Sequence, residues 1–363
     1  MAKKLTIQDI ARLGNVSIGT VSRVLNNKPD VDPSTRERIL RIVEEQGYVP
    51  SITAAGLAVG HNRLISVLVP ALTWPMIPEL MRSVAEIVDD LSYEIVLYSI
   101  SSSNHERDCG KIIDRILATK LTAGLLAIHP GQSAQHLVEL QKHRFPVVLI
   151  DDQNAPPDGI PWVGTDNYSG AYEATRHLLR LGHRRIATIQ GPMKFKVSRD
   201  RYQGFCDALL EAGIPLDPEL VLEGDFTFGG GKRCAQEFFE RPLAERPTAV
   251  FAGSDQTAYG VIAAAEVCGL HIPDDIALVG FDDNPSSAHM QPALTTIRQP
   301  FSEMGQRAIR LLLSSIERSR PAHQKRIENG QQAHDVIEEA QRIQLPTTLV
   351  IRDSCGASRK YAL

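Results

Sequence analysis

The sequence has few cysteines and no long apolar run. Its five cysteines, among 363 residues, are odd in number and never in Cys-x-x-Cys spacing, which argues against a disulfide framework or a cysteine-rich zinc site. No apolar stretch approaches the roughly 18 residues that span a bilayer, and the N-terminus lacks the apolar core of a signal peptide. With 43% hydrophobic and 23% charged residues, the composition is neither disordered nor fibrous. We expect a globular cytoplasmic protein.

Signatures of catalysis are missing as well. The sequence contains no His-Glu-x-x-His, no Gly-x-Ser-x-Gly and no Rossmann glycine fingerprint, and its eleven histidines show no metal-ligand pairing. Residues 228–233 resemble a phosphate loop only in part. Phe226 stands five positions before Gly231, and Arg233 follows the lysine where Ser or Thr is required. We therefore expect a loop that enters a helix at this segment, and no enzyme activity, cofactor or metal.

The net charge of -4 is unevenly distributed. Residues 1–60 hold eight Lys or Arg against six Asp or Glu, whereas the rest of the chain holds 31 against 37. Only four of the six acidic residues lie before residue 43, whereas all eight basic ones do. A basic N-terminus can face a polyanion, although a solvated helix face gives the same count.

Three short helices are predicted in the first fifty residues. Thr6, with an acid three positions later, is typical of a helix start, and Gly14 ends that helix. A second helix follows Ser17 and carries apolar residues on one face until residues 26–30 break it. A third begins near Asp32 or Ser34 and stops at Gly47 and the following Pro50. This spacing predicts a helix, a tight turn, a second helix and a supporting helix.

From residue 64 onward, apolar runs alternate with amphipathic helices. Such alternation predicts parallel sheets with right-handed crossovers, and some 290 residues of it predict two lobes. The expected strands are 64–69, 95–99, 124–128, 147–150, 186–189, 249–252, 276–281 and 348–352. The expected helices are near 78–91, 108–118, 134–143, 168–181, 199–212, 258–268 and 301–315. Residues 317–343 are polar, charged and helix-prone, which indicates a surface insertion.

These segments resemble the LacI/GalR family of bacterial transcription regulators. Residues 16–26, Val-Ser-Ile-Gly-Thr-Val-Ser-Arg-Val-Leu-Asn, are similar to the recognition-helix signature of that family. Further family motifs follow in order over nearly the whole chain, at 47–50, 163–167, 177–186, 201–205, 279–283 and 345–349. The chain departs from the family at Ser51, Ala55 and Ser254, and the insertion at 317–343 is longer than usual.

The resemblance implies a fold class and a domain order. The expected fold is an N-terminal all-α helix-turn-helix domain plus an α/β two-lobed domain like the periplasmic binding proteins, with parallel sheets. The expected boundaries are a DNA-binding domain at 1–50, a hinge helix or linker at 51–62, an effector-binding and dimerisation domain at 63–353, and a C-terminal tail at 354–363.

A helix that enters the major groove needs short outward side chains or donors aimed at base edges. Arg23 can form a bidentate bond to guanine, and Ile18 offers only apolar contact. The resemblance implies a hinge helix that folds on operator DNA and inserts Leu57 into the minor groove. The alternatives are a solvated Arg23, a Ser17 that only caps its helix, and a flexible tether with Leu57 packed on the core. The expected DNA contacts are Thr6, Ser17, Ile18, Gly19, Thr20, Ser22, Arg23, Asn26 and Leu57.

In open α/β sheets a ligand lies beyond the carboxyl ends of the strands. Carboxylates beside an arginine and an aromatic face describe a polyol or sugar site. The alternative is that Asp255 and Asp283 cap the following helices and Arg201 makes a structural ion pair. The effector contacts that the resemblance implies are Trp74, Asp151, Arg201, Phe226, Ser254, Asp255 and Asp282.

The sequence thus predicts a homodimeric transcription repressor. It binds double-stranded operator DNA, and a carbohydrate-like effector controls that binding. An effector that is a purine or another non-sugar metabolite is the competing hypothesis, because an aromatic face stacks a base as readily as a pyranose. Two hypotheses of a different class are a sugar-binding protein of the periplasmic type and an enzyme on a doubly wound fold. The basic N-terminal helices disfavour the first, and the missing catalytic signatures disfavour the second.

Overall fold

The computed structural model describes residues 5–25, 28–48, 62–91, 93–100, 105–119, 121–128, 134–151, 158–319 and 341–357. The chain divides into two compact units. The first is Met1–Leu64 with Lys120–Ala123, and the second is Ile65–Thr119 with Gly124–Leu363. Among the described residues, no helix is long and apolar enough to cross a membrane.

The N-terminal unit contains the three predicted helices. They are α1 (Ile7–Gly14), α2 (Ile18–Leu25) and α3 (Pro33–Glu45). Thr6 caps α1, since its side chain accepts from the Asp9 N–H while Asp9 accepts from the Thr6 N–H. Asn15 turns the chain between α1 and α2 in the left-handed conformation. A small apolar core joins the helices and consists of Ile10, Ala11, Val21, Val24 and Ile39.

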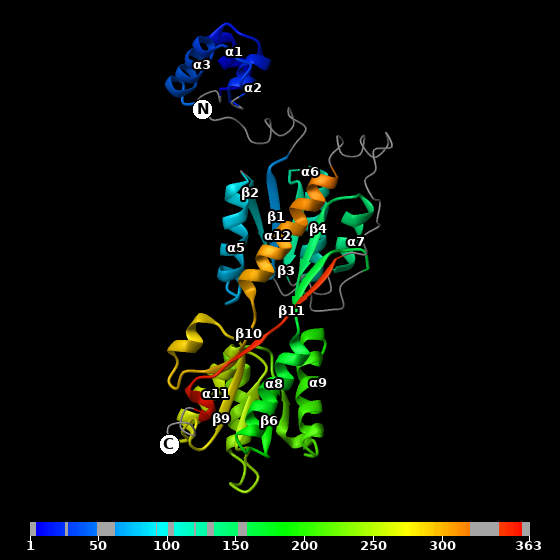
Figure 1. Cartoon of the computed structure of the whole chain (residues 1–363), viewed down its shortest axis with the longest axis vertical. Helices are drawn as coiled ribbons and strands as arrows, with labels where there is room; N and C mark the ends of the chain where they lie inside the picture. Colours follow the sequence, from blue (N-terminus) through cyan, green and yellow to red (C-terminus); the bar gives the residue numbers. More distant parts are fainter. Residues whose placement is uncertain are drawn as a thin grey trace. The chain divides into compact units, whose positions relative to one another are not determined.

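The second unit contains two six-stranded sheets. The first sheet has the order β11-β5-β4-β3-β1-β2 and pairs β1, β3, β4, β5 and β11 in parallel. Helices α5 and α12 contact each other, and α12 also packs on β3, β4 and β5 (Figure 1). The strands are β1 (Leu64–Val69), β2 (Glu94–Ser99), β3 (Gly124–Ile128), β4 (Val147–Ile150), β5 (Trp162–Thr165) and β11 (Arg342–Leu345). The helices are α5 (Ile77–Asp90), α6 (His105–Thr119), α7 (Ala134–Lys142) and α12 (Phe301–Arg318).

The second sheet has the order β12-β10-β9-β8-β6-β7 and is parallel except for the β10/β12 pair. Helices α8 and α9 cover one face of this sheet and α10 and α11 the other, and a separate apolar core lies under each pair. The strands are β6 (Ile186–Gln190), β7 (Val221–Glu223), β8 (Ala249–Ala252), β9 (Ala277–Asp282), β10 (Thr295–Arg298) and β12 (Thr348–Val350). The helices are α8 (Asn167–Arg180), α9 (Lys196–Glu211), α10 (Phe228–Phe239) and α11 (Asp255–Val267).

Three chain segments cross between the two sheets. They connect β5 to α8, β10 to α12, and β11 to β12 (Figure 1). The first and third crossovers are bonded together, because the Asp166 N–H donates to the Leu345 carbonyl at 2.9 Å. The expected fold class, a helix-turn-helix domain plus a two-lobed domain with parallel sheets, is confirmed.

Several local predictions were wrong or incomplete. Four strands were not predicted, β5, β7, β10 and β11, which have three or four residues each. The loop that enters α10 ends at Thr227, which caps the helix, so residues 228–233 are already helical. The expected insertion is structured at its ends, where α12 runs to Arg318 and β11 starts at Arg342. Residues 320–340 lie outside the described residues. The boundary expected at 353/354 passes through the short helix η4 (Asp353–Cys355), which is partly buried.

Candidate functional site

The outer face of α2 presents side chains suited to DNA. Ile18, Gly19 and Arg23 are exposed, and 45% of Ile18 is open to solvent although it is apolar. Ser17 accepts from the Thr20 N–H at 3.1 Å, which satisfies one of the free donors at the helix start. Val21 and Val24 point the other way, into the core. The helix therefore buries one face and leaves short side chains and one arginine on the other.

Arg23 has an ionic partner. Its Nε lies 3.5 Å from the Asp30 carboxylate, and both side chains are more than half exposed. An exposed pair of this kind contributes about 0–1 kcal/mol, so a base edge can displace Asp30 at little cost. Among the other expected DNA contacts, Thr6 caps α1 with an exposed side chain, and Thr20 and Ser22 are partly exposed. Asn26 and Leu57, and nearly all of the expected hinge, lie outside the described residues.

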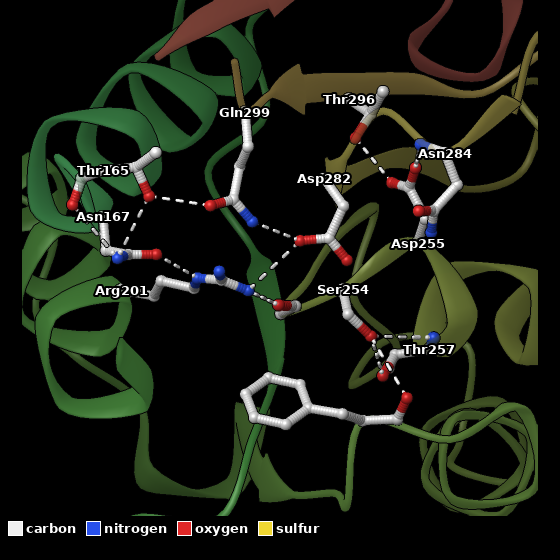
Figure 2. Close-up of polar contacts among 12 residues, drawn as sticks. Thr165, Asn167, Arg201, Ser254, Asp255, Thr257, Asp282, Asn284, Thr296 and Gln299 are labelled. Atoms are coloured by element: carbon white, nitrogen blue, oxygen red, sulfur yellow. Dashed lines mark hydrogen bonds and ion pairs between the residues drawn. The ribbon is translucent and has the colours of Figure 1, made fainter. Parts of the chain in front are cut away.

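Arg201 is the centre of a second cluster, at the carboxyl ends of the second sheet. It is 6% exposed, its Nε donates to Asn167 Oδ1 at 2.8 Å, and its Nη1 donates to the Gly253 carbonyl at 2.6 Å. Nη1 also lies 3.8 Å from Asp282 Oδ1. Figure 2 shows the guanidinium extending from Asn167 toward Asp282. Burial lowers the pKa of Arg201, and the charges of Asp282, Asp151 and Asp255 act in the opposite direction.

Two carboxyl groups near this guanidinium, those of Asp282 and Asp255, have raised pKa values. Burial raises the pKa of Asp282 to about 6, although Arg201 opposes the shift. Burial, followed by the charge of Asp282, raises the pKa of Asp255 to about 8. Because the charge of Asp282 raises the pKa of Asp255, a ligand that neutralises Asp282 lowers the pKa of Asp255.

Asp255 and Ser254 are held by protein groups. Asp255 is fully buried, and its carboxylate accepts from the Asn284 N–H at 2.7 Å, from Ser287 at 2.6 Å and from Thr296 at 2.5 Å. Ser254 caps α11 by accepting from the Thr257 N–H at 3.2 Å. The alternative that Asp255 caps this helix was wrong, because the cap is Ser254, one residue earlier. Asp255 thus supports the site from within the protein.

Asp283 also differs from its predicted role. Its carboxylate lies 2.6 Å from Arg298 Nε and 2.6 Å from Arg352 Nη2. The cap of the next short helix, η3 (Pro285–His289), is Asn284 without a side-chain bond. The alternative of a capping Asp283 was therefore wrong, and the residue joins β9, β10 and the C-terminal segment.

Phe226 forms an aromatic wall beside Arg201. The guanidinium carbon lies 5.8 Å from the centre of the Phe226 ring. Phe226 has a positive φ of 63°, a conformation that costs energy in a residue other than glycine. Its ring covers Gly191, where a Cβ would lie 1.9 Å from the ring Cζ. Glycine at 191 therefore sets how closely the ring packs on β6.

The remaining expected contacts come from the first sheet. Trp74 lies in the turn after β1, and Asp151 directly follows β4. Asp151 is 2% exposed and has a positive φ of 47°. Its charge acts on both Arg201 and Asp282, which places it within electrostatic reach of the cluster. No group of three or more His, Cys, Asp or Glu in the described part of the chain is arranged to hold a metal ion.

Comparison with known proteins identifies both parts of the chain. Residues 6–51 match the profile of the bacterial regulatory proteins of the lacI family, and residues 175–355 match a periplasmic binding protein-like domain. Catabolite control protein A of Priestia megaterium is 34% identical over 312 residues, which cover 85% of this chain and 91% of that protein. The chain belongs to the LacI family.

Other LacI-family proteins are similar over comparable lengths. The repressor PurR of Photorhabdus laumondii is 35% identical over 86% of this chain and 90% of its own. The structure of the lac repressor dimer bound to operator and the anti-inducer ONPF has a TM-score of 0.80 and 27% identity, over 97% of this chain and 99% of that one. The complex of the regulator CelR with cellobiose has a TM-score of 0.66 and 30% identity, over 96% and 99%. These relatives are transcription regulators.

Three polar residues around Arg201 and Asp282 are not among those that the sequence predicts. Thr165, Asn167 and Gln299 are buried and hydrogen bonded to the Arg201–Asp282 cluster or to each other. Thr165 ends β5, and Gln299 follows β10. Polar residues directly after apolar strands were the signal used for other positions. It failed here because neither strand had been recognised.

Proposed function

We propose that the chain is a transcriptional repressor whose affinity for double-stranded operator DNA is set by a small carbohydrate-like effector bound at Arg201 and Asp282. The observation that carries the proposal is the buried guanidinium beside a carboxylate. Nε and Nη1 of Arg201 are used by the protein, and no described residue accepts a hydrogen bond from Nη2. The ligand supplies that acceptor.

A hydroxyl group fits this pair of partners. It accepts from a guanidinium N–H and donates to a carboxylate at the same time, whereas a carbonyl or an anion only accepts. Neighbouring hydroxyls of a sugar engage Arg201 and Asp282 together. Asp151 and Trp74 complete the site from the first sheet, with Phe226 as a stacking face and Ser254 nearby.

A purine or nucleoside effector is the second candidate. Phe226 supports it, because a ring held beside a guanidinium stacks a base as well as a pyranose. The similarity to PurR makes purines a necessary part of any screen. Calorimetric titration with mono- and disaccharides, nucleosides and purine bases separates the two classes. Binding of a base with no binding of any sugar contradicts the sugar proposal.

The DNA-binding part of the proposal assigns residues 1–50 to operator recognition and 51–62, with Leu57, to the hinge. Residues 63–353 bind the effector and form the dimer, and residues 354–363 are a tail. One helix-turn-helix unit contacts one half-site, so we propose a homodimer on a pseudo-palindrome. Sedimentation tests the dimer. A monomer at micromolar concentration that keeps full operator affinity contradicts it.

Selection of duplexes from random DNA with the full-length chain tests operator binding. We expect enrichment of pseudo-palindromes with half-sites about one helical turn apart. Enrichment of no sequence contradicts the assignment of operator recognition to α2. Gel shifts of the selected duplex with and without effector then show whether the ligand weakens or strengthens binding.

A further inference from the structure

A continuous set of hydrogen bonds leads from the Arg201–Asp282 pair to the crossovers. Gln299 Nε2 donates to Asp282 Oδ1 at 2.7 Å, and Thr165 Oγ1 donates to Gln299 Oε1 at 2.7 Å. Asn167 Nδ2 donates to the Thr165 carbonyl at 3.2 Å, and Asn167 Oδ1 accepts from Arg201. Figure 2 shows Gln299 between Thr165 and Asp282.

The donor at each step is fixed by chemistry. An ionised carboxylate only accepts hydrogen bonds, so the NH2 group of Gln299 must face Asp282. Its oxygen then faces Thr165, and the hydroxyl of Thr165 must donate. The amide of Gln299 thus responds at one end to the charge of Asp282 and at the other end orients Thr165.

These residues lie on the crossovers themselves. Thr165 is the last residue of β5, before the crossover to α8, and Gln299 lies on the crossover from β10 to α12. The third crossover is attached as well, since Thr347 Oγ1 donates to the Asp166 carbonyl at 3.4 Å and the Asp166 N–H donates to Leu345. Gln299 therefore bonds Asp282 directly to Thr165 on the first connection while lying on the second itself, and the third is attached through Asp166.

Three residues of the network are buried. Thr165 and Asn167 are 3% exposed and Gln299 is 5% exposed. A buried polar group that loses its partner has no solvent to replace it, so a change at one bond is passed to the next.

We propose that Gln299 is a positioning residue that couples the effector-contacting carboxylate of Asp282 to the crossovers at Thr165 and Thr347. A ligand hydroxyl that donates to Asp282 competes with the Gln299 NH2 group, and the amide then shifts its bond to Thr165. This inference rests on the proposed function, because it takes Asp282 as an effector contact. Its test needs neither effector nor DNA, so it can fail or succeed independently of the proposed function.

Protonation of the carboxyl cluster serves as the probe. Three charged or titratable residues face Asp282: Arg201 of α9, Asp255 of α11 and Asp151, which follows β4. Proton uptake by Asp282 changes its hydrogen bonds, as a bound ligand does. The full-length chain is labelled at threonine methyl groups and titrated between about pH 5 and about pH 8 by NMR. We expect the Thr165 and Thr347 methyl resonances to shift with pH, and Asp282→Asn to remove the shift.

Gln299→Met removes both hydrogen-bonding groups and keeps the length of the side chain. We expect the pH-dependent shift of Thr165 and Thr347 to be lost. The methyl resonance of Thr296, whose hydroxyl donates to Asp255, should still shift with pH and show that the site is folded. Thr165→Val is a second variant, which removes the Thr165 hydroxyl and nearly keeps the shape of the side chain. Thr347 is then the only reporter, and we expect its pH-dependent shift to be lost. Thr175→Val removes a buried hydroxyl that donates to the Ala171 carbonyl within α8, and it should leave the Thr165 shift intact.

Two results overturn the proposal. One is a Thr165 shift in Gln299→Met that equals the shift in the wild type. The other is a wild-type Thr165 resonance that does not move with pH.

Discussion

The guanidinium carbon of Arg201 lies 3.7 Å from the centre of the Phe281 ring. Phe281 is fully buried in β9, so the ring fixes the plane of the guanidinium. Asn167 and Gly253 then fix its rotation within that plane. The orientation of the arginine toward Asp282 is therefore set before any ligand arrives, which lowers the entropy cost of binding.

Arg201→Lys should weaken effector binding although it keeps the positive charge. A lysine ammonium cannot stack on Phe281 and donate to Asn167 and Gly253 in one plane. We expect a loss of about 10- to 100-fold in effector affinity by calorimetry, with operator affinity in the absence of effector near that of the wild type. Arg199→Lys, on the exposed side of the same helix, is the matched control. If Arg201→Lys bound the effector with unchanged affinity, Arg201 would not be an effector contact.

Gly191→Ala should disturb the aromatic wall, because the added Cβ would meet the Phe226 ring. We expect it to weaken effector binding about as much as Phe226→Ala does, by roughly 0.5–1.5 kcal/mol, and the double variant to be no worse than either. Gly229→Ala is the control, since its nearest neighbour is Thr227 Oγ1 at 3.8 Å. Additive losses in the double variant would mean that Gly191 does not act through Phe226.

Asp282→Asn should stabilise the effector-free protein at neutral pH. Because folding raises the pKa of Asp282 to about 6, its contribution to stability is full below the unfolded value and is lost as the pH rises through about 6. The variant lacks this loss, so we expect a gain of about 1–3 kcal/mol in unfolding free energy near pH 7.5 and a smaller gain near pH 4.5, measured in urea.

Asp283→Asn is the control of opposite sign. Its carboxylate is buried between Arg298 and Arg352, so its loss should destabilise the protein at neutral pH. If Asp282→Asn were equally destabilising there, Asp282 would be a structural ion-pair partner of Arg201 and not an effector contact.

Arg23→Ala should cost about 1–3 kcal/mol on the selected operator and much less on random DNA, if Arg23 contacts a base. Leu57→Ala should weaken operator binding through a reduced kink. Asp30→Asn frees Arg23 from its partner and should leave operator affinity equal or slightly higher. Equal losses of Arg23→Ala on operator and random DNA, measured by gel shift at one salt concentration, would make it a phosphate contact.

Two glycines, Gly231 in the glycine-rich segment 229–231 and Gly260 in α11, are required by the packing of two helices. A Cβ at Gly231 would lie 2.2 Å from the Thr257 carbonyl, and one at Gly260 would lie 2.2 Å from the Phe228 carbonyl. These glycines allow α10 and α11 to pack backbone to backbone. The spacing of the sequence excluded a phosphate loop, but it carried no signal for the contact between two helices about thirty residues apart.

The sequence by itself determined the three N-terminal helices and the alternation of strands and helices, because capping residues and apolar periodicity act within one or two turns of chain. Its motifs were also sufficient for the family. It singled out Arg201 and Asp282 as well, since both lie in motifs that resemble the family's.

Only the tertiary structure decided which polar groups meet. β5 and β11 pair with each other across about 180 residues, and β10 pairs with β12 more than fifty residues later. These strands are short, so the residues at their ends, Thr165 and Gln299, had no local signal. Likewise, Asp255 and Ser254 are adjacent in sequence, yet one accepts three bonds inside the protein and the other caps a helix. The physical reason is that burial and hydrogen-bond partners are properties of the packed chain. Residues 181 positions apart, Thr347 and Asp166, are hydrogen bonded here.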